Sequence, residues 1–100
     1  MKVIVDLCVV PLGVGVSLAP YVAACERVLQ EAGLEVQLHP NGTSIAGDWI
    51  PVFAAIEACH AAVHAMGCPR IHSVVKINTR TDRDQSLEEK VASVEALLSA

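Results

Sequence analysis

The spacing of apolar residues predicts a strand and then a helix in the first third of the chain. Residues 2–10 are rich in β-branched side chains, and the turn residues from Pro11 to Gly15 are expected to end this strand. Apolar residues then recur at helical spacing until Gly33, and Ser17 is placed to cap the helix by accepting a bond from a free backbone amide. The apolar stripe consists of Leu18, Val22, Cys25, Leu29 and Ala32.

The middle of the chain predicts a hairpin and a second helix. Residues 34–39 alternate between apolar and polar side chains, and the turn Pro40-Asn-Gly42 leads into a short strand at 43–46. Asp48 is a second candidate N-cap, and an apolar stripe at helical spacing follows over residues 52–66.

The last third predicts the most regular strand and a terminal helix. Apolar and polar residues alternate from Arg70 to Arg80, which is typical of a strand with two unlike faces. After a polar connector, Ser86 and Glu89 match a capping box, and an apolar stripe continues to Leu98.

These elements predict an α+β fold. Their order is strand, helix, strand, strand, helix, strand, with an extra C-terminal helix. Two split strand-helix-strand units on one antiparallel sheet make the ferredoxin-like βαββαβ arrangement, in which both helices cover one face of the sheet. At 100 residues the chain is long enough for one domain, expected to span residues 1–100.

The sheet face opposite the helices is expected to be half apolar. Alternation along the first strand turns one set of apolar side chains toward the helices and leaves a second set on the other face. That second set, with one residue of the last strand, is Ile4, Cys8, Val10 and Val74. Such a face stays exposed unless the C-terminal helix, a second subunit, or both cover it. We therefore expect a homo-oligomer, most simply formed by two sheets that meet face to face.

Composition and charge narrow the classes of function. Apolar residues make up 53% of the chain and charged residues 18%, which excludes intrinsic disorder. The net charge of −4 disfavours nonspecific binding to nucleic acid or to anionic membranes. No apolar stretch can span a bilayer, and no secretory signal is expected. The four scattered cysteines are expected to be reduced core thiols of a cytoplasmic protein.

Two glycine-containing loops are candidates for binding a small ligand. Gly13 and Ser17 lie in the loop after the first strand, which is either a plain connection or a place where amides and a hydroxyl meet a polar ligand. In the second loop Gly42 lets a ligand approach the backbone and Thr43 offers a donor and an acceptor, with an ordinary hairpin turn as the alternative. Trp49 supplies a flat ring for a heterocycle or a cation, unless it fills the core or a subunit interface.

Other chemistry finds less support in the residues. His60 and His64 lie one helical turn apart and could hold a metal ion, but histidines beside an apolar stripe more often border a subunit contact, and we expect no metal. No nucleophile, base and orienting acid form a recognisable pattern, so we expect no catalytic site and no cofactor. The last strand is basic, but it lacks the aromatic residues on which RNA bases stack, which favours charge pairing across a subunit seam. The basic residues are Arg70, His72, Lys76 and Arg80.

Several segments, in their order and spacing, resemble one protein family. They are Val9-Val-Pro11-Leu-Gly13 followed by Ser17, Tyr21-Val22, Pro40-Asn-Gly-Thr43, Gly47-Asp48, the helix that carries His60, and Arg70 to Arg80 with Lys90-Val91 behind. Over nearly its whole length the chain is similar to the small thiamine-binding proteins of the YkoF-like group, long grouped as an uncharacterised protein family.

The resemblance implies a ferredoxin-like domain that dimerises through its sheets, often pairs into tetramers, and binds thiamine or a related aminopyrimidine without transforming it. The hydroxyl positions of the family's pocket fall on Ser17 and Thr43. Two positions depart from the family, which usually has Met at Asn41 and Glu at Ala46, so a carboxylate near the pocket is missing. We expect binding of thiamine or its hydroxymethylpyrimidine portion near the two loops. The alternative is an oligomeric structural or regulatory module without a small ligand.

Overall fold

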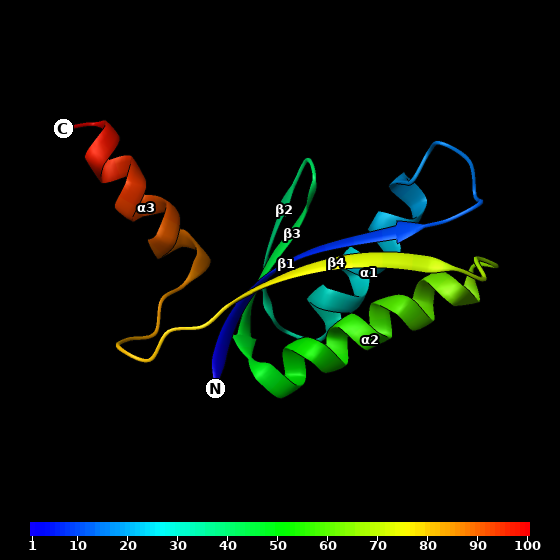
Figure 1. The fold of residues 1–100 in the computed structure, drawn as a ribbon, viewed down its shortest axis with the longest axis horizontal. Helices are drawn as coiled ribbons and strands as arrows, with labels where there is room; N and C mark the ends of the chain where they lie inside the picture. The colour runs from blue at the N-terminus through cyan, green and yellow to red at the C-terminus, as the bar shows by residue number, and fades with distance from the viewer.

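Strands and helices follow one another in the order that the sequence predicts (Figure 1). In the computed structural model, which describes residues 1–100, the strands are β1 (Lys2–Pro11), β2 (Glu35–His39), β3 (Gly42–Asp48) and β4 (Ile71–Asn78). The helices are α1 (Ala19–Glu31), α2 (Trp49–Ala65) and α3 (Leu87–Leu98). The strands form one antiparallel sheet in the order β2-β3-β1-β4, which confirms the ferredoxin-like arrangement. None of the helices has both the length and the apolarity needed to cross a bilayer.

The hydrophobic core lies between the sheet and the pair α1 and α2. The central strand β1 buries Val3, Val5 and Leu7 there, on the face that alternation predicts. The helices contribute aliphatic and thiol side chains, which are Cys25, Leu29, Val52, Ala55, Ile56, Cys59 and Val63. The few aromatic side chains pack only at the margin of this cluster. Burial of aliphatic surface therefore holds the two layers together.

The three expected helix caps have different outcomes. Ser17 does not cap α1: the N-cap position is Leu18, and no side chain bonds to the first amides. Pro20 in the first turn has no amide to satisfy, which reduces the need for a cap. Asp48 does precede α2, but its Oδ2 accepts from Lys2 Nζ at 3.4 Å and not from the helix. Only Ser86 acts as predicted, because its Oγ accepts from the backbone amide of the helix three residues on, at 3.1 Å.

Helix α3 leaves the open face of the sheet uncovered. Figure 1 shows it standing apart from the layers formed by the sheet, α1 and α2. Only Leu87 of α3 is buried, and its backbone amide donates to Glu35 Oε1 at 3.0 Å. The apolar side chains further along are exposed, up to 79% at Leu98, and Val74 on the open face of the sheet is 48% exposed. Two apolar surfaces thus have no partner within the subunit.

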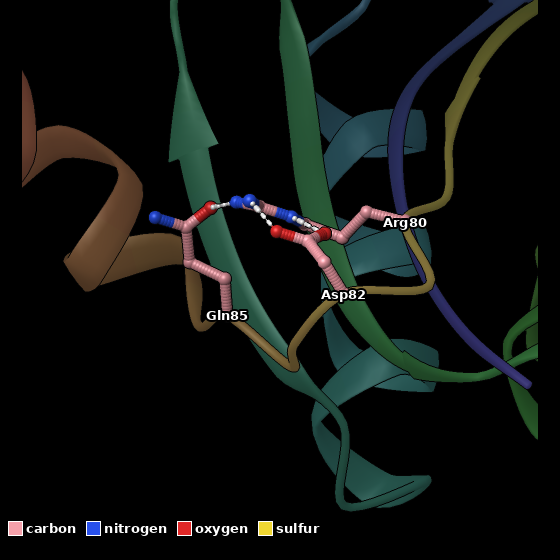
Figure 2. Close-up of polar contacts among 3 residues, drawn as sticks. All are labelled: Arg80, Asp82 and Gln85. Atoms are coloured by element: carbon pink, nitrogen blue, oxygen red, sulfur yellow. Dashed lines mark hydrogen bonds and ion pairs between the residues drawn. The ribbon is translucent and has the colours of Figure 1, made fainter.

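Arg80 braces the segment between β4 and α3 (Figure 2). Its Nε and Nη2 donate to the two carboxylate oxygens of Asp82 at 2.7 and 2.5 Å, and its Nη1 donates to Gln85 Oε1 at 3.0 Å. The guanidinium of Arg80 lowers the pKa of Asp82 to about 2. Because the pKa of Asp82 is lower in the folded protein, the ionised carboxylate stabilises the fold at every pH above the ordinary pKa of an aspartate. This contribution is lost as the pH falls through about 2. The acidic partner of Arg80 therefore lies within the subunit, whereas the sequence analysis favoured a partner across an interface between subunits.

Candidate ligand-binding site

A cleft of about 290 Å³ opens between α1 and the hairpin of β2 and β3. Its walls come from the last half of β1, from α1 and from the hairpin turn, so that segments distant in the sequence meet there. Of its 15 lining residues 9 are hydrophobic. The polar side chains among the others include Glu26, His39, Asn41 and Thr43. A largely apolar wall with a few placed polar groups is the usual form of a small-molecule site.

Thr43 and Glu26 form the central polar pair of the cleft. Alternation along β3 turns Thr43 toward the helices, where it is only 6% exposed. Its Oγ1 donates to Glu26 Oε1 at 2.5 Å, and no other protein donor bonds to this carboxylate. Because its hydroxyl proton is committed to Glu26, Thr43 can offer a ligand only an acceptor lone pair. The pair therefore presents an oriented negative charge and acceptors, which suits a ligand with an amino group or a positive charge.

A second polar pair crosses the sheet at the edge of the cleft. His39 on β2 places Nε2 2.9 Å from Asp6 Oδ1 on β1, although β3 lies between these strands. Gly42 pairs with His39 in the register, and a Cβ at this position would lie 2.7 Å from the Leu7 carbonyl oxygen and 3.1 Å from Asp6 Oδ1. The bare glycine lets the histidine reach across the strand. The φ of Gly42 is not in the left-handed region, so its backbone conformation does not require glycine. Glycine is needed here because only a residue without a Cβ fits this close packing.

The four residues predicted as ligand contacts do not all line this cleft. Thr43 lines it. Gly13 and Ser17 belong to the loop that joins two of its walls, the end of β1 and Leu18 at the start of α1. Both are exposed, and Gly13 has a φ of 77°, a conformation that side chains other than glycine rarely adopt. Of these three residues only Thr43 lines the cleft, whereas Gly13 and Ser17 lie in the connection between the lining residues Val10 and Leu18.

Trp49, the fourth predicted contact, lies at the other end of the sheet. Its backbone amide donates to the Met1 carbonyl oxygen at 2.8 Å, at the start of β1, whereas Thr43 pairs with Leu7 further along that strand. Its ring packs on Phe53 with the centroids 4.7 Å apart and contacts the core. Within one subunit the ring does not line the cleft, and it has the packing role that the sequence left open.

Glu26 is the site residue that sequence reasoning missed. The resemblance drew attention to position 46, where Ala46 replaces the usual glutamate, and suggested a site without a carboxylate. The tertiary structure supplies one from α1 instead. A signal was present, because Glu26 follows Val22 by four positions and so lies on the inward face of the helix.

The histidines of α2 are engaged in local bonds. His60 Nε2 lies 2.7 Å from Ser73 Oγ on β4, and His64 Nδ1 lies 2.8 Å from the Cys68 carbonyl oxygen. The two rings are 6.3 Å apart between centroids. No group of three His, Cys, Asp or Glu side chains comes together as a metal ion would require. These histidines connect α2 to β4 and to the turn that follows the helix.

Comparison with known proteins identifies the family of this chain. A family model described as thiamine-binding protein matches residues 5–95. A UPF0045 protein of Synechocystis sp. is 64% identical over 98 residues, which cover 98% of this chain and 81% of the relative. The UPF0045 protein ECM15 of Eremothecium gossypii is 38% identical over 100 residues, or 99% of this chain and 95% of the relative.

Two solved structures share the fold. A hypothetical protein of Methanocaldococcus jannaschii superposes with a TM-score of 0.86 at 29% identity, covering 94% of this chain and 96% of the other. A Thermotoga maritima protein, whose name proposes a role in thiamine biosynthesis or salvage, has a TM-score of 0.81 at 18% identity, covering 94% and 99%. This second likeness shows the fold alone. From the match over residues 5–95 and the curated relatives, the chain belongs to the thiamine-binding protein family.

Proposed function

We propose that this protein binds thiamine, or its hydroxymethylpyrimidine portion, in the cleft between α1 and the hairpin, and does not transform it. The observation that carries the proposal is the Glu26 carboxylate, oriented by the Thr43 hydroxyl inside a mostly apolar cleft. Membership of a thiamine-binding family supports the choice of ligand.

The chemistry of thiamine matches the groups that the cleft offers. Thiamine joins an aminopyrimidine, which donates and accepts hydrogen bonds, to a permanently cationic thiazolium. A fixed carboxylate can attract the cation or accept from the amino group, and the apolar walls can hold the rings. Gly13 and Ser17, in the loop between the cleft-lining residues Val10 and Leu18, are the further proposed contacts through a backbone amide and a hydroxyl. The net charge of −4 also favours a cationic ligand.

Calorimetry on the unmodified protein tests the proposal. We expect thiamine and hydroxymethylpyrimidine both to release or absorb heat on titration and to raise the melting temperature, with thiamine bound more tightly because it alone is cationic. Choline is the control ligand, since it carries a permanent charge without a pyrimidine, and should bind weakly or not at all. Absence of heat and of a thermal shift with millimolar thiamine would contradict the proposal and favour a structural or regulatory module.

We also propose that copies of this chain assemble into a homodimer or homotetramer through the open sheet face and α3. The exposed apolar residues of both surfaces support this, because monomers rarely leave such patches in water. We expect sedimentation velocity at micromolar concentration to show an oligomer, and Val74→Asp to shift it toward monomer. Val16→Asp is the matched control, because Val16 is a fully exposed loop valine that belongs neither to the sheet nor to α3. A monomer alone in the unmodified protein would overturn this part.

The cytoplasm is the proposed location. All four cysteines are unpaired, three of them buried, and a reducing compartment keeps such thiols free. A substantial fraction of the protein in an oxidising compartment, found by fractionation of cells that express it, would argue against this location.

A further inference from the structure

Two buried thiols from different helices meet beneath the cleft. Cys25 on α1 and Cys59 on α2 are 34 positions apart in the chain and are 6% and 0% exposed. Cys59 Sγ donates to the Cys25 carbonyl oxygen at 3.7 Å. The Cys59 thiol therefore lies directly against the backbone of Cys25 in the packed core.

The two thiols differ in their access to small molecules. Cys25 lines the cleft next to Glu26, whereas Cys59 lies behind it in the core. A small solute in the cleft therefore meets the sulfur of Cys25 first. The hydrogen bond from the Cys59 thiol lowers the pKa of Cys25. The same bond, with burial, raises the pKa of Cys59. Cys25 is thus the more nucleophilic thiol, and Cys59 is placed to resolve whatever forms on it.

We propose that Cys25 and Cys59 form a dithiol that a hydroperoxide oxidises to a disulfide joining α1 and α2 at the floor of the cleft. The Cys25 thiolate attacks one peroxide oxygen, the O–O bond breaks, and the departing oxygen takes up a proton, which leaves a sulfenic acid. The sulfur of Cys59 then attacks the sulfenic sulfur, and the S–O bond breaks. The hydroxide that departs takes the Cys59 thiol proton and leaves as water. In total two thiols lose two electrons and two protons, and hydrogen peroxide becomes two waters.

The other cysteines provide the controls. Cys8 also lines the cleft, so it tests whether access alone determines the reaction. The contact that Cys59 makes with Cys25 has no counterpart at Cys8. Cys68 is buried, and its Sγ donates to the Arg70 carbonyl oxygen at 3.1 Å. Only the pair Cys25 and Cys59 combines access with an adjacent thiol.

The experiment treats the reduced full-length chain with a small excess of hydrogen peroxide, alkylates the remaining thiols, and maps the peptides by mass spectrometry. We expect two of the four thiols to disappear, a loss of about 2 Da in the unalkylated chain, and a linked peptide pair containing Cys25 and Cys59. The oxidised protein should melt at least about 5 °C higher, because the cross-link restricts the unfolded chain. Dithiothreitol should reverse both changes.

Two variants sharpen the result. Cys8→Ser should oxidise as the unmodified chain does, whereas Cys59→Ala should stop at a Cys25 sulfenic acid that dimedone traps. Retention of all four thiols, or a disulfide that includes Cys8 or Cys68, would overturn the proposal. Peptide mapping of the unmodified protein decides the matter even where Cys59→Ala fails to fold. The experiment contains no thiamine, so its outcome is independent of the proposed ligand.

Discussion

Replacing Gly42 with alanine is expected to lower the midpoint of thermal unfolding by about 10–20 °C. The added Cβ would lie 2.7 Å from the Leu7 carbonyl oxygen, a backbone atom of the central strand. This oxygen cannot move away without disturbing the pairing of β1, so the strain should cost about 2–3 kcal/mol. The same methyl group would lie 3.3 Å from His39 Cε1 and should also weaken the bond between His39 and Asp6. Differential scanning calorimetry measures the change.

Gly47→Ala, in the same strand, is the matched control. Its Cβ would meet only the ends of side chains, Leu34 Cδ2 at 3.0 Å and Val52 Cγ2 at 3.2 Å. Side-chain ends can shift by a few tenths of an ångström, whereas a paired backbone cannot, so we expect a clearly smaller loss of stability. If Gly42→Ala melts within about 2 °C of the unmodified protein, the interpretation of Gly42 as a close-packing position is wrong.

Replacing Glu26 with glutamine is expected to weaken thiamine binding by about 10–100-fold. The amide keeps the shape of the side chain and can still accept from Thr43, but it carries no negative charge for the thiazolium. Hydroxymethylpyrimidine is neutral, so its affinity should fall less than that of thiamine. Calorimetric titration of both ligands separates the contribution of the charge from that of the hydrogen bonds.

Glu31→Gln controls for the charge of the whole chain, because Glu31 is exposed at the end of the same helix and outside the cleft. It should bind thiamine as the unmodified protein does. Thr43→Val, which removes the hydroxyl that orients Glu26, should weaken binding about tenfold. If the unmodified protein and Glu26→Gln bind thiamine with equal affinity, Glu26 is not part of the site. If Glu26→Gln and Glu31→Gln lose the same affinity for thiamine, Glu26 acts only through the long-range charge of the chain.

The elements were predictable because their signals are local. Alternation over residues 2–10 identified the strand and the side of it that meets the helices, and Val5 and Leu7 are buried there. The ends of elements were less predictable, because each end depends on an individual hydrogen bond at the cap. Ser17 has the right residue type for a cap, yet the helix begins two residues later, whereas Ser86 does cap its helix.

The site was predictable only in part. Thr43 lines the cleft, but Gly13 and Ser17 are not among its lining residues, although their loop connects two residues that are, Val10 and Leu18. Trp49 was predicted to lie beside Thr43 because the two are only six positions apart in the sequence. The extended strand β3 runs between them, so Trp49 lies at the opposite end of the sheet. Residues that are close in sequence lie far apart in space when an extended strand separates them.

By itself the sequence determined the order of strands and helices, the buried face of the central strand, and the likeness to a thiamine-binding family, because each depends on residue type and short-range spacing. The tertiary structure alone decided that Glu26 meets Thr43, that Cys25 meets Cys59, and that His39 reaches Asp6 over a bare Gly42. Those contacts join residues 17, 34 and 33 positions apart. They depend on strand register and on how two helices cross, which no local pattern of side chains specifies.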